Sequence, residues 1–129
     1  MKFILILCLT LLSCNASILS ENIRESDSLS IDFADQNQVV IKQIETTDKT
    51  AINKLIDYIG NKTFQKNKCS LGGRILFYRS GVVVEQVEFN SSGDCRYFTF
   101  KKNGELISTK MNDEAASFLE SLKSGRTYY

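Results

Sequence analysis

GRILFYRSGVVVEQVEFNSSGDCRYFTFKKNGELIST, residues 73–109, contains four short runs rich in β-branched and aromatic residues: RILFY, VVVEQVEF, CRYFTF and ELIST. Three turn-forming segments, RSG, NSSGD and KNG, separate these runs, and Asn103-Gly104 is the strongest hairpin signal in the chain. The stretch therefore predicts four successive antiparallel strands.

Two further strands are predicted ahead of this meander. Apolar residues alternate with polar ones at Leu29, Ile31 and Phe33, which is the period of a half-buried strand. The run QVVIKQI at residues 38–44 follows the polar connection ADQNQ at 34–38, so these two strands are expected to form a hairpin.

Two amphipathic helices are predicted, one before the meander and one after it. In TTDKTAINKLIDYIG, Thr47 or Asp48 can cap the start and Gly60 can end the helix. In NDEAASFLESLKSG, Asn112 or Asp113 stands at the cap position. The apolar stripes consist of Ile52, Leu55, Ile56 and Ile59 in the first helix and of Ala115, Phe118, Leu119 and Leu122 in the second.

The predicted order of elements is ββα-ββββα, with no internal repeat, and it places the chain in the α+β class. We expect a two-layer sandwich in which an antiparallel sheet of about six strands carries both helices on one face. Residues 29–129 are expected to form a single domain.

The amino terminus has the profile of a signal peptide. Lys2 precedes an unbroken apolar run from Phe3 to Leu12, after which small and polar residues follow. The run is about half the roughly 20 apolar residues that a membrane-spanning helix needs. The chain is therefore expected to be exported without a permanent membrane span.

The segment LLSC, residues 11–14, resembles the lipobox of bacterial lipoproteins. In that family the signal peptide ends before the cysteine, whose sulfur receives a diacylglycerol and whose amino group is commonly acylated. The resemblance implies a signal peptide at 1–13, a lipidated Cys14 and a membrane-anchored protein of the bacterial envelope. Cleavage after Ala16 by ordinary signal peptidase is the alternative, and it predicts a secreted protein.

Residues 17–28, SILSENIRESDS, are polar and show no sustained period, so we expect residues 14–28 to form a flexible tether. Once the leader is removed, about 115 residues remain, the size of one ordinary domain. Loss of Lys2 leaves 15 basic residues against 15 acidic ones, and this neutral balance argues against a nucleic-acid partner.

Two cysteines remain for the folded domain, Cys69 and Cys95, and in an exported protein such a pair predicts a disulfide. The bridge closes a loop of 27 residues, for which chain entropy alone predicts a stabilisation of about 3 kcal/mol. Two thiols in a chain without histidine make a poor zinc site, so we expect neither a metal nor a cofactor.

The chain lacks a recognisable catalytic motif. It contains no histidine, which excludes Ser-His-Asp triads. Glu85 and Glu88 stand three residues apart on a predicted strand, so their side chains are expected on opposite faces of the sheet, and the same holds for Asp32 and Asp35. We therefore interpret these carboxylates as solvent-facing charges and expect no catalytic residues.

Aromatic and basic side chains interleave on neighbouring strands of the meander, a pattern that can stack rings and hold anions. Phe98 and Phe100 are expected to face the core, and the favoured interpretation of the whole pattern is core aromatics beside exposed bases. The remaining candidate ligand face consists of Tyr78, Arg79, Arg96, Tyr97 and Lys101.

Two functional hypotheses follow. The leading one is a small, membrane-anchored envelope lipoprotein that acts as a non-enzymatic binding module, with an envelope protein or a glycan as its partner. The alternative is a small hydrolase or lipid-handling protein of the envelope that uses carboxylates in the groove between helices and sheet. Two convergent acids in a pocket, with raised pKa values, would distinguish the alternative.

Overall fold

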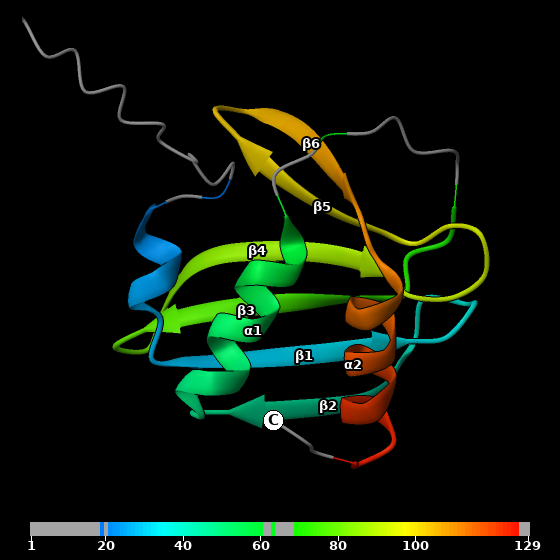
Figure 1. Ribbon diagram of the computed structural model, residues 1–129, viewed down its shortest axis with the longest axis horizontal. Coiled ribbons are helices and arrows are strands. Elements are labelled where there is room, and N and C mark those ends of the chain that lie inside the picture. Colours follow the sequence, from blue (N-terminus) through cyan, green and yellow to red (C-terminus); the bar gives the residue numbers. More distant parts are fainter. Residues whose placement is uncertain (1–18, 20, 61–62, 64–68, 127–129) are drawn as a thin grey trace, which may run out of the picture.

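The computed structural model describes residues 19, 21–60, 63 and 69–126 of the chain (Figure 1). The predicted leader and the lipidation site at Cys14 lie outside the described residues. The elements in chain order are the 3-10 helix η1 (Glu21–Glu25), β1 (Ser28–Ala34), β2 (Val40–Thr46), α1 (Lys49–Ile59), β3 (Gly73–Arg79), β4 (Val82–Asn90), β5 (Tyr97–Lys102), β6 (Glu105–Lys110) and α2 (Asp113–Lys123).

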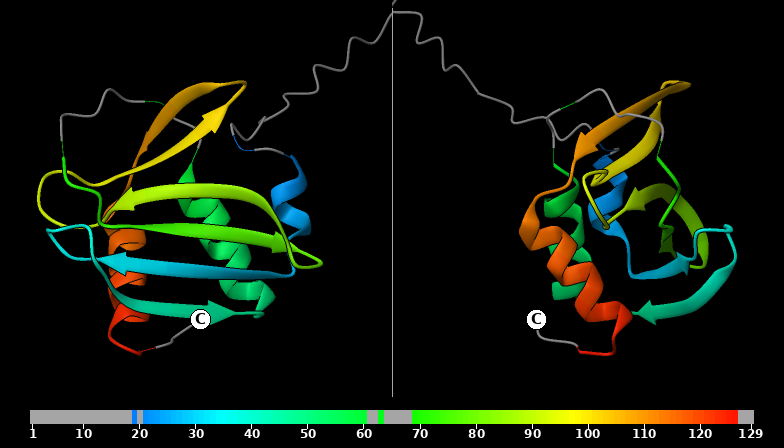
Figure 2. Two further views of the ribbon diagram at one scale, coloured as in Figure 1. Left: turned by 180° about the vertical axis from the view of Figure 1, so that it is seen from behind. Right: turned by 90° about the vertical axis from the view of Figure 1, so that its right-hand side faces the viewer.

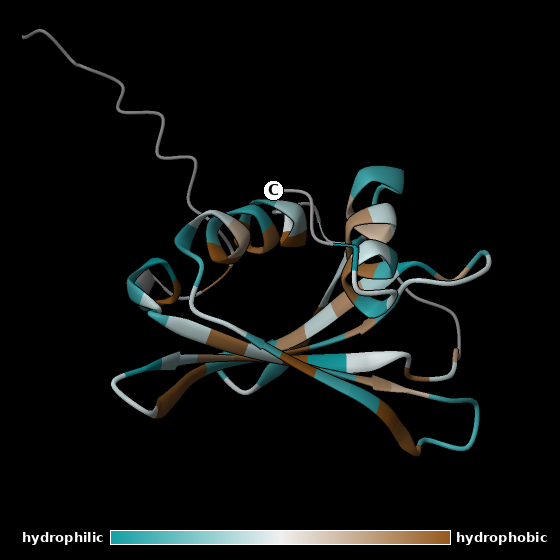
Figure 3. Cartoon of the chain, turned by 90° about the horizontal axis from the view of Figure 1, so that it is seen from below, coloured by the Kyte–Doolittle hydropathy of each residue, from teal (hydrophilic) through white to brown (hydrophobic). Residues whose placement is uncertain are grey.

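The predicted fold class and element order are confirmed. One antiparallel sheet contains six strands in the spatial order β2-β1-β3-β4-β5-β6. Since β1 pairs antiparallel with both β2 and β3, those two strands run parallel to each other and need a crossover, which α1 supplies. Figures 2 and 3 show α1 and α2 packed on the same face of the sheet.

Both helices begin at the residues that the sequence indicates. The Asp48 side chain accepts hydrogen bonds from the backbone N–H groups of Thr50 and Ala51, at 2.8 and 3.2 Å. Asn112 caps α2 through the backbone N–H of Ala115 at 2.8 Å. Each cap satisfies donors that have no partner within the helix, which fixes where the helix starts.

The core lies between the helices and the sheet, and register partners of adjacent strands fill it in rows. Ile31 stands opposite Ile44 on one side and Ile75 on the other, and Ile75 stands opposite Val87. Ile31, Ile75 and Val87 are fully buried. The apolar stripe of α1 packs on these rows, because burial of its four large aliphatic side chains removes their surface from water.

Gly73 is required by this packing. A Cβ atom at this position would lie 2.2 Å from the carbonyl oxygen of Asp32 and 2.6 Å from the ring of Phe89. Both distances are shorter than any van der Waals contact, so β3 can enter the sheet here only without a side chain.

The predicted tether is shorter than expected, because folding begins well before Leu29. Leu19 and Ile23 belong to the core, with 3% and 1% of their surfaces exposed, and η1 forms within the segment assigned to the tether. A helical turn of five residues is too short to show a hydrophobic period, and Ile23 is the one apolar residue within it.

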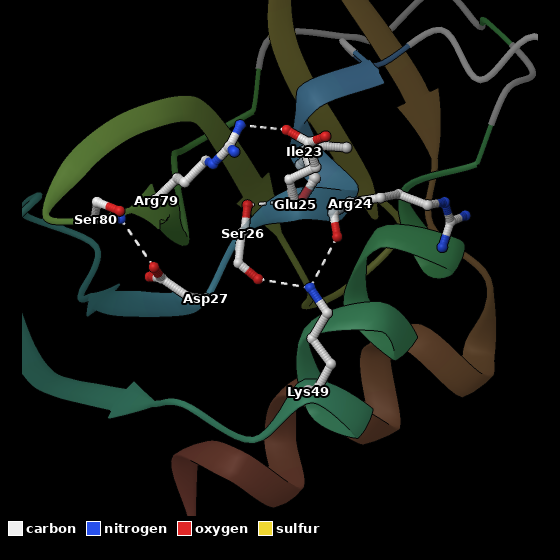
Figure 4. Close-up of polar contacts among 8 residues, drawn as sticks. All are labelled: Ile23, Arg24, Glu25, Ser26, Asp27, Lys49, Arg79 and Ser80. Carbon is white, nitrogen blue, oxygen red and sulfur yellow. Dashed lines mark hydrogen bonds and ion pairs between the residues drawn. The ribbon is translucent and has the colours of Figure 1, made fainter.

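Several polar contacts hold η1 against the rest of the domain (Figure 4). The Lys49 ammonium on α1 donates to the backbone carbonyls of Arg24 and Ser26, at 2.8 and 2.7 Å. The Asp27 carboxylate accepts from the backbone N–H of Ser80 at 2.9 Å, and Arg79 forms an ion pair with Glu25. These contacts join η1 to both α1 and the β3–β4 turn.

The predicted disulfide is present between Cys69 and Cys95, whose Cα atoms lie 6.2 Å apart. The backbone N–H of Gly72 donates to the carbonyl of Phe89 at 2.8 Å, so the segment before β3 stays beside β4 up to the bridge. The disulfide therefore joins the chain before β3 to the chain before β5, across the turn that connects β4 with β5.

Candidate functional site

The face of the sheet opposite the helices, called here the open face, is crossed by a continuous row of polar side chains. Register partners contribute one residue from each strand, in the order Gln43, Asp32, Arg74, Glu88, Thr99 and Ser108. Within the described residues, no helix packs on this face (Figure 3). The sheet ladder sets the spacing of these side chains, of which Asp32 and Thr99 are buried and the other four are at least partly exposed.

The row contains a buried carboxylate. The Asp32 side chain is only 8% exposed and accepts a hydrogen bond from the Arg74 guanidinium, with 2.9 Å between Oδ2 and Nε. Its second oxygen, Oδ1, is buried without a hydrogen-bond partner among the described atoms. The prediction of Asp32 as a solvent-facing charge was wrong, since the sequence could not show that Arg74 would pair with it across β1 and β3.

Arg74 stands between two acidic register partners and forms its ion pair with Asp32. Glu88 stands opposite Arg74 on β4, as Asp32 does on β1. About half of the Arg74 side chain remains exposed, at 48%. A guanidinium that is paired with one carboxylate through Nε and half open to solvent has donors left for a ligand or partner, since each guanidinium carries five N–H groups.

A first hollow lies where β4 and β5 separate. The two strands share only three register pairs, Glu88–Thr99, Phe89–Phe98 and Asn90–Tyr97, and beyond these the β5–β6 hairpin bends away from β4 (Figure 1). This β4–β5 hollow has a volume of about 290 Å³ and is lined by Glu85, Gln86, Glu88, Thr99, Phe100, Lys101 and Leu106.

Glu85 is the electrostatically unusual group of the β4–β5 hollow. Burial raises the pKa of its carboxyl above the ordinary value, and a hydrogen bond from the Gln86 backbone opposes part of this shift. Register places Glu85 opposite Phe77 and Glu88 opposite Arg74, so the two acids do start from opposite faces, as expected. They nevertheless line one hollow, because the sheet opens between β4 and β5.

A second hollow, called here the Tyr78 hollow, lies at the other end of the open face. It has a volume of about 480 Å³ and is lined by Ser28, Leu29, Ser30, Glu45, Thr46, Thr47, Tyr78 and Gly81. Tyr78 stands directly opposite Ser28, and its hydroxyl lies 3.4 Å from the hydroxyl of Ser30, two residues further along β1. The lining is therefore dominated by hydroxyl groups from three strands and the β2–α1 connection.

The five residues of the predicted ligand face do not come together. Tyr78 lines the second hollow and Lys101 the first, whereas Arg79 pairs with Glu25 and Arg96 pairs with Asp113. Tyr97 is 2% exposed, and burial followed by the Glu88 charge raises the pKa of its hydroxyl.

Strand direction explains the separation of the two tyrosines. Because β3 and β5 both run antiparallel to β4, they run parallel to each other. Tyr78 near the end of β3 and Tyr97 at the start of β5 therefore lie at opposite ends of the sheet. The sequence pattern did not contain the register of the strands, which is why it grouped the two tyrosines in one ligand face.

Apolar side chains are also exposed near the hollows and on the sheet edge. Val83 stands opposite Tyr78 and is 47% exposed, and Leu106 stands opposite Lys101 and is 67% exposed. On the edge strand β2, Val40 and Ile41 are 53% and 55% exposed. Each hollow thus has an apolar neighbour suited to contact with a partner.

Comparison with protein-family models, with curated proteins and with solved structures found no match. Among the described residues, no helix is long and apolar enough to cross a membrane. The same part of the chain contains no cluster of histidine, cysteine and acidic side chains arranged to bind a metal ion.

The raised pKa of Glu85 predicts a pH-dependent effect of Glu85→Gln. At pH values below the ordinary pKa of 4.5, the carboxyl is protonated in folded and unfolded chains alike, and the substitution should leave stability unchanged. As the pH rises through the raised folded-state pKa, the ionised carboxylate destabilises the folded chain, and Gln avoids this cost.

Thermal unfolding followed by circular dichroism at pH 3.5 and pH 7 measures this difference. We expect Glu85→Gln to raise the unfolding temperature at pH 7 and to match the parent at pH 3.5. Glu105→Gln, at an exposed position on β6, is the control and should shift neither value. A lower unfolding temperature for Glu85→Gln at pH 7 would contradict the assignment.

Proposed function

We propose that this chain is a membrane-anchored lipoprotein of the bacterial envelope that binds an envelope partner through the open face of its sheet and has no enzymatic activity. The observation that carries the proposal is the open face itself. In the described part of the chain, helices cover one side of the sheet, and the other side presents a polar row flanked by two hollows. Because a fold alone does not define a function, the proposal depends on the chemistry of this surface.

The chemistry of the open face supports binding. Arg74 is oriented by Asp32 and keeps about half of its surface exposed, and arginine is enriched among the residues that dominate binding interfaces. Because the contact with Asp32 already restricts its side chain, less conformational entropy is lost when a partner binds.

The envelope location rests on two features of the chain. The LLSC segment resembles a lipobox, and a lipid anchor with two or three acyl chains holds a protein stably on a membrane. The Cys69–Cys95 disulfide is typical of an exported protein, since cytosolic thiols are kept reduced.

A first experiment tests the anchor and the redox state together. The full-length gene is expressed in a bacterium, and the intact mass of the membrane-fraction protein is measured before and after reduction. We expect a chain that starts at Cys14 and carries acyl mass, and a gain of two hydrogen atoms on reduction. A Cys14→Ala variant is the control and should lose the acyl mass. If the parent protein were instead found as a soluble chain that starts at Ser17, it would be a secreted protein and the anchor would be ruled out.

A second experiment tests the open face by photo-crosslinking in intact cells. A benzophenone amino acid replaces Leu106 or Val83 on the open face, or Ser117 on the exposed side of α2 as the control. We expect a discrete crosslinked species from the two open-face positions and none from the helix position. Equal crosslinking from all three, or crosslinking from Ser117 alone, would contradict the proposed surface.

One observation favours a second candidate function, a carboxylate-dependent hydrolase. Glu85 and Glu88 line the same hollow, and burial raises the pKa of Glu85, which is a feature of general acids. The site differs from the expected groove between helices and sheet, because that layer is filled by buried apolar side chains such as Ile31 and Ile75.

Chromogenic esters and glycosides test this candidate. It predicts turnover by the parent protein that falls at least a hundredfold in Glu85→Gln, since general acid–base catalysis contributes about 10²–10⁴ in rate. Glu105→Gln again serves as the control and should keep full activity. The same low rate in all three proteins would eliminate the hydrolase and leave the binding module.

A further inference from the structure

We propose that the Tyr78 hollow is a binding subsite for an uncharged sugar residue of a glycan. The inference names the ligand class of one part of the open face and therefore rests on the proposed binding function. Three features of the hollow support the inference: the hydroxyl groups of its lining, the charge of its lining side chains and the placement of Tyr78.

The lining offers the hydrogen-bonding groups that a sugar needs. Five side-chain hydroxyls contribute to it, together with the carboxylate of Glu45, and they belong to Ser28, Ser30, Thr46, Thr47 and Tyr78. Each hydroxyl both donates and accepts, and an ionised carboxylate accepts only. A ring that carries several hydroxyl groups presents the matching mixture of donors and acceptors, and Glu45 gives it one strong acceptor.

The polar groups of the hollow are organised rather than scattered. The Thr46 hydroxyl accepts from the backbone N–H of Asp48 at 3.1 Å, which leaves its proton available for donation. The Tyr78 and Ser30 hydroxyls lie 3.4 Å apart, at the long end of hydrogen bonding, so the hydroxyl of the half-buried Tyr78 can turn to a ligand while Ser30 lies buried behind it.

The charge of the lining side chains disfavours anionic ligands. Among the described residues that line the hollow, Glu45 is the only charged one, and none is a lysine or an arginine. A phosphate, sulfate or uronate bound there would face this carboxylate without compensation, and like charges at close range repel. The β4–β5 hollow differs in this respect, because it contains Lys101 beside its two glutamates.

Tyr78 supplies the apolar surface. Its Cα is paired with that of Ser28, but its hydroxyl reaches Ser30, so the side chain leans along β1. Diagonal neighbours of this kind are within reach of an aromatic side chain on a sheet. A tyrosine so placed offers an apolar ring for the C–H groups of a sugar and a polar tip for its hydroxyls.

The volume of the hollow is consistent with a small ligand. At about 480 Å³ it falls within the range of roughly 300–1,000 Å³ that is typical of small-molecule sites. Apart from Thr47 in the β2–α1 connection, its lining comes from β1, β2, β3 and the turn at Gly81, which are held by the sheet and by the η1 contacts.

Three trisaccharides of different charge test the inference by isothermal titration calorimetry on the membrane-extracted mature protein in detergent micelles. They are tri-N-acetylchitotriose, which is neutral, the glucosamine trimer, which is cationic at pH 6, and the galacturonic acid trimer, which is anionic. We expect the neutral trimer to bind with a dissociation constant in the millimolar range or below. The anionic trimer should bind at least tenfold more weakly than the neutral one.

Variants of the hollow locate the binding. Tyr78→Ala should weaken the neutral trimer at least tenfold, whereas Tyr78→Phe, which retains the ring, should weaken it only a few-fold. Glu45→Gln should reduce the discrimination against the anionic trimer. Lys101→Ala, in the other hollow, is the control and should bind the neutral trimer like the parent, and unfolding temperatures verify that each variant is folded.

Three outcomes overturn the inference: no heat from the neutral trimer at 20 mM, unchanged affinity in Tyr78→Ala, or preferred binding of the cationic trimer through Glu45.

A second experiment separates the sugar subsite from the wider binding surface by repeating the photo-crosslinking from Leu106 in the Tyr78→Ala background. Persistent crosslinking without sugar binding leaves the open-face proposal standing and removes only the sugar subsite. Sugar binding without any open-face crosslinking keeps the subsite and removes the wider interface with an envelope protein.

Discussion

The pairing of β1 along both of its edges determines the rest of the architecture. Every residue from Leu29 to Phe33 has a register partner on β2 and another on β3. Two strands that flank a common antiparallel partner must run parallel, and a parallel connection needs a crossover element. The helix α1 is that crossover, so the face that it covers becomes the core and the opposite face stays open (Figure 2).

Local signals in the sequence were sufficient to predict the elements. Alternation at Leu29, Ile31 and Phe33 and the caps at Asp48 and Asn112 each depend on residues within a few positions, and the structure confirms the strand and both caps. The expected half-burial of the strand was wrong, because the polar residues between these three positions are buried as well. The helical turn η1 and the buried Leu19 before it were missed, because Leu19 and Ile23 are too few to form a period. Its stability comes from tertiary contacts such as Lys49 with the Arg24 carbonyl, which no local pattern reveals.

The candidate site could not be predicted in the same way, because it is formed by residues that are far apart in the sequence and that meet only through strand pairing. Asp32 and Arg74 are separated by 42 positions and meet only because β1 and β3 are neighbours in a particular register. Tyr78 does line a hollow, but its neighbours there are Ser30 and Glu45 rather than the basic residues that the aromatic-basic pattern suggested. A shift of one residue in register would have placed these side chains on the other face.

The early start of the domain changes how an anchored protein would sit at a membrane. With Cys14 lipidated as proposed, only five peptide units separate the lipid from the buried Leu19, and they span at most about 18 Å even when fully extended. Since the backbone N–H of Asp27 donates to the carbonyl of Tyr78 at 2.9 Å, the segment that follows η1 lies beside the Tyr78 hollow. The proposed anchor and the proposed subsite are thus linked through one short, folded segment. Such a geometry favours ligands that lie close to the membrane surface over partners that reach deep into the surroundings.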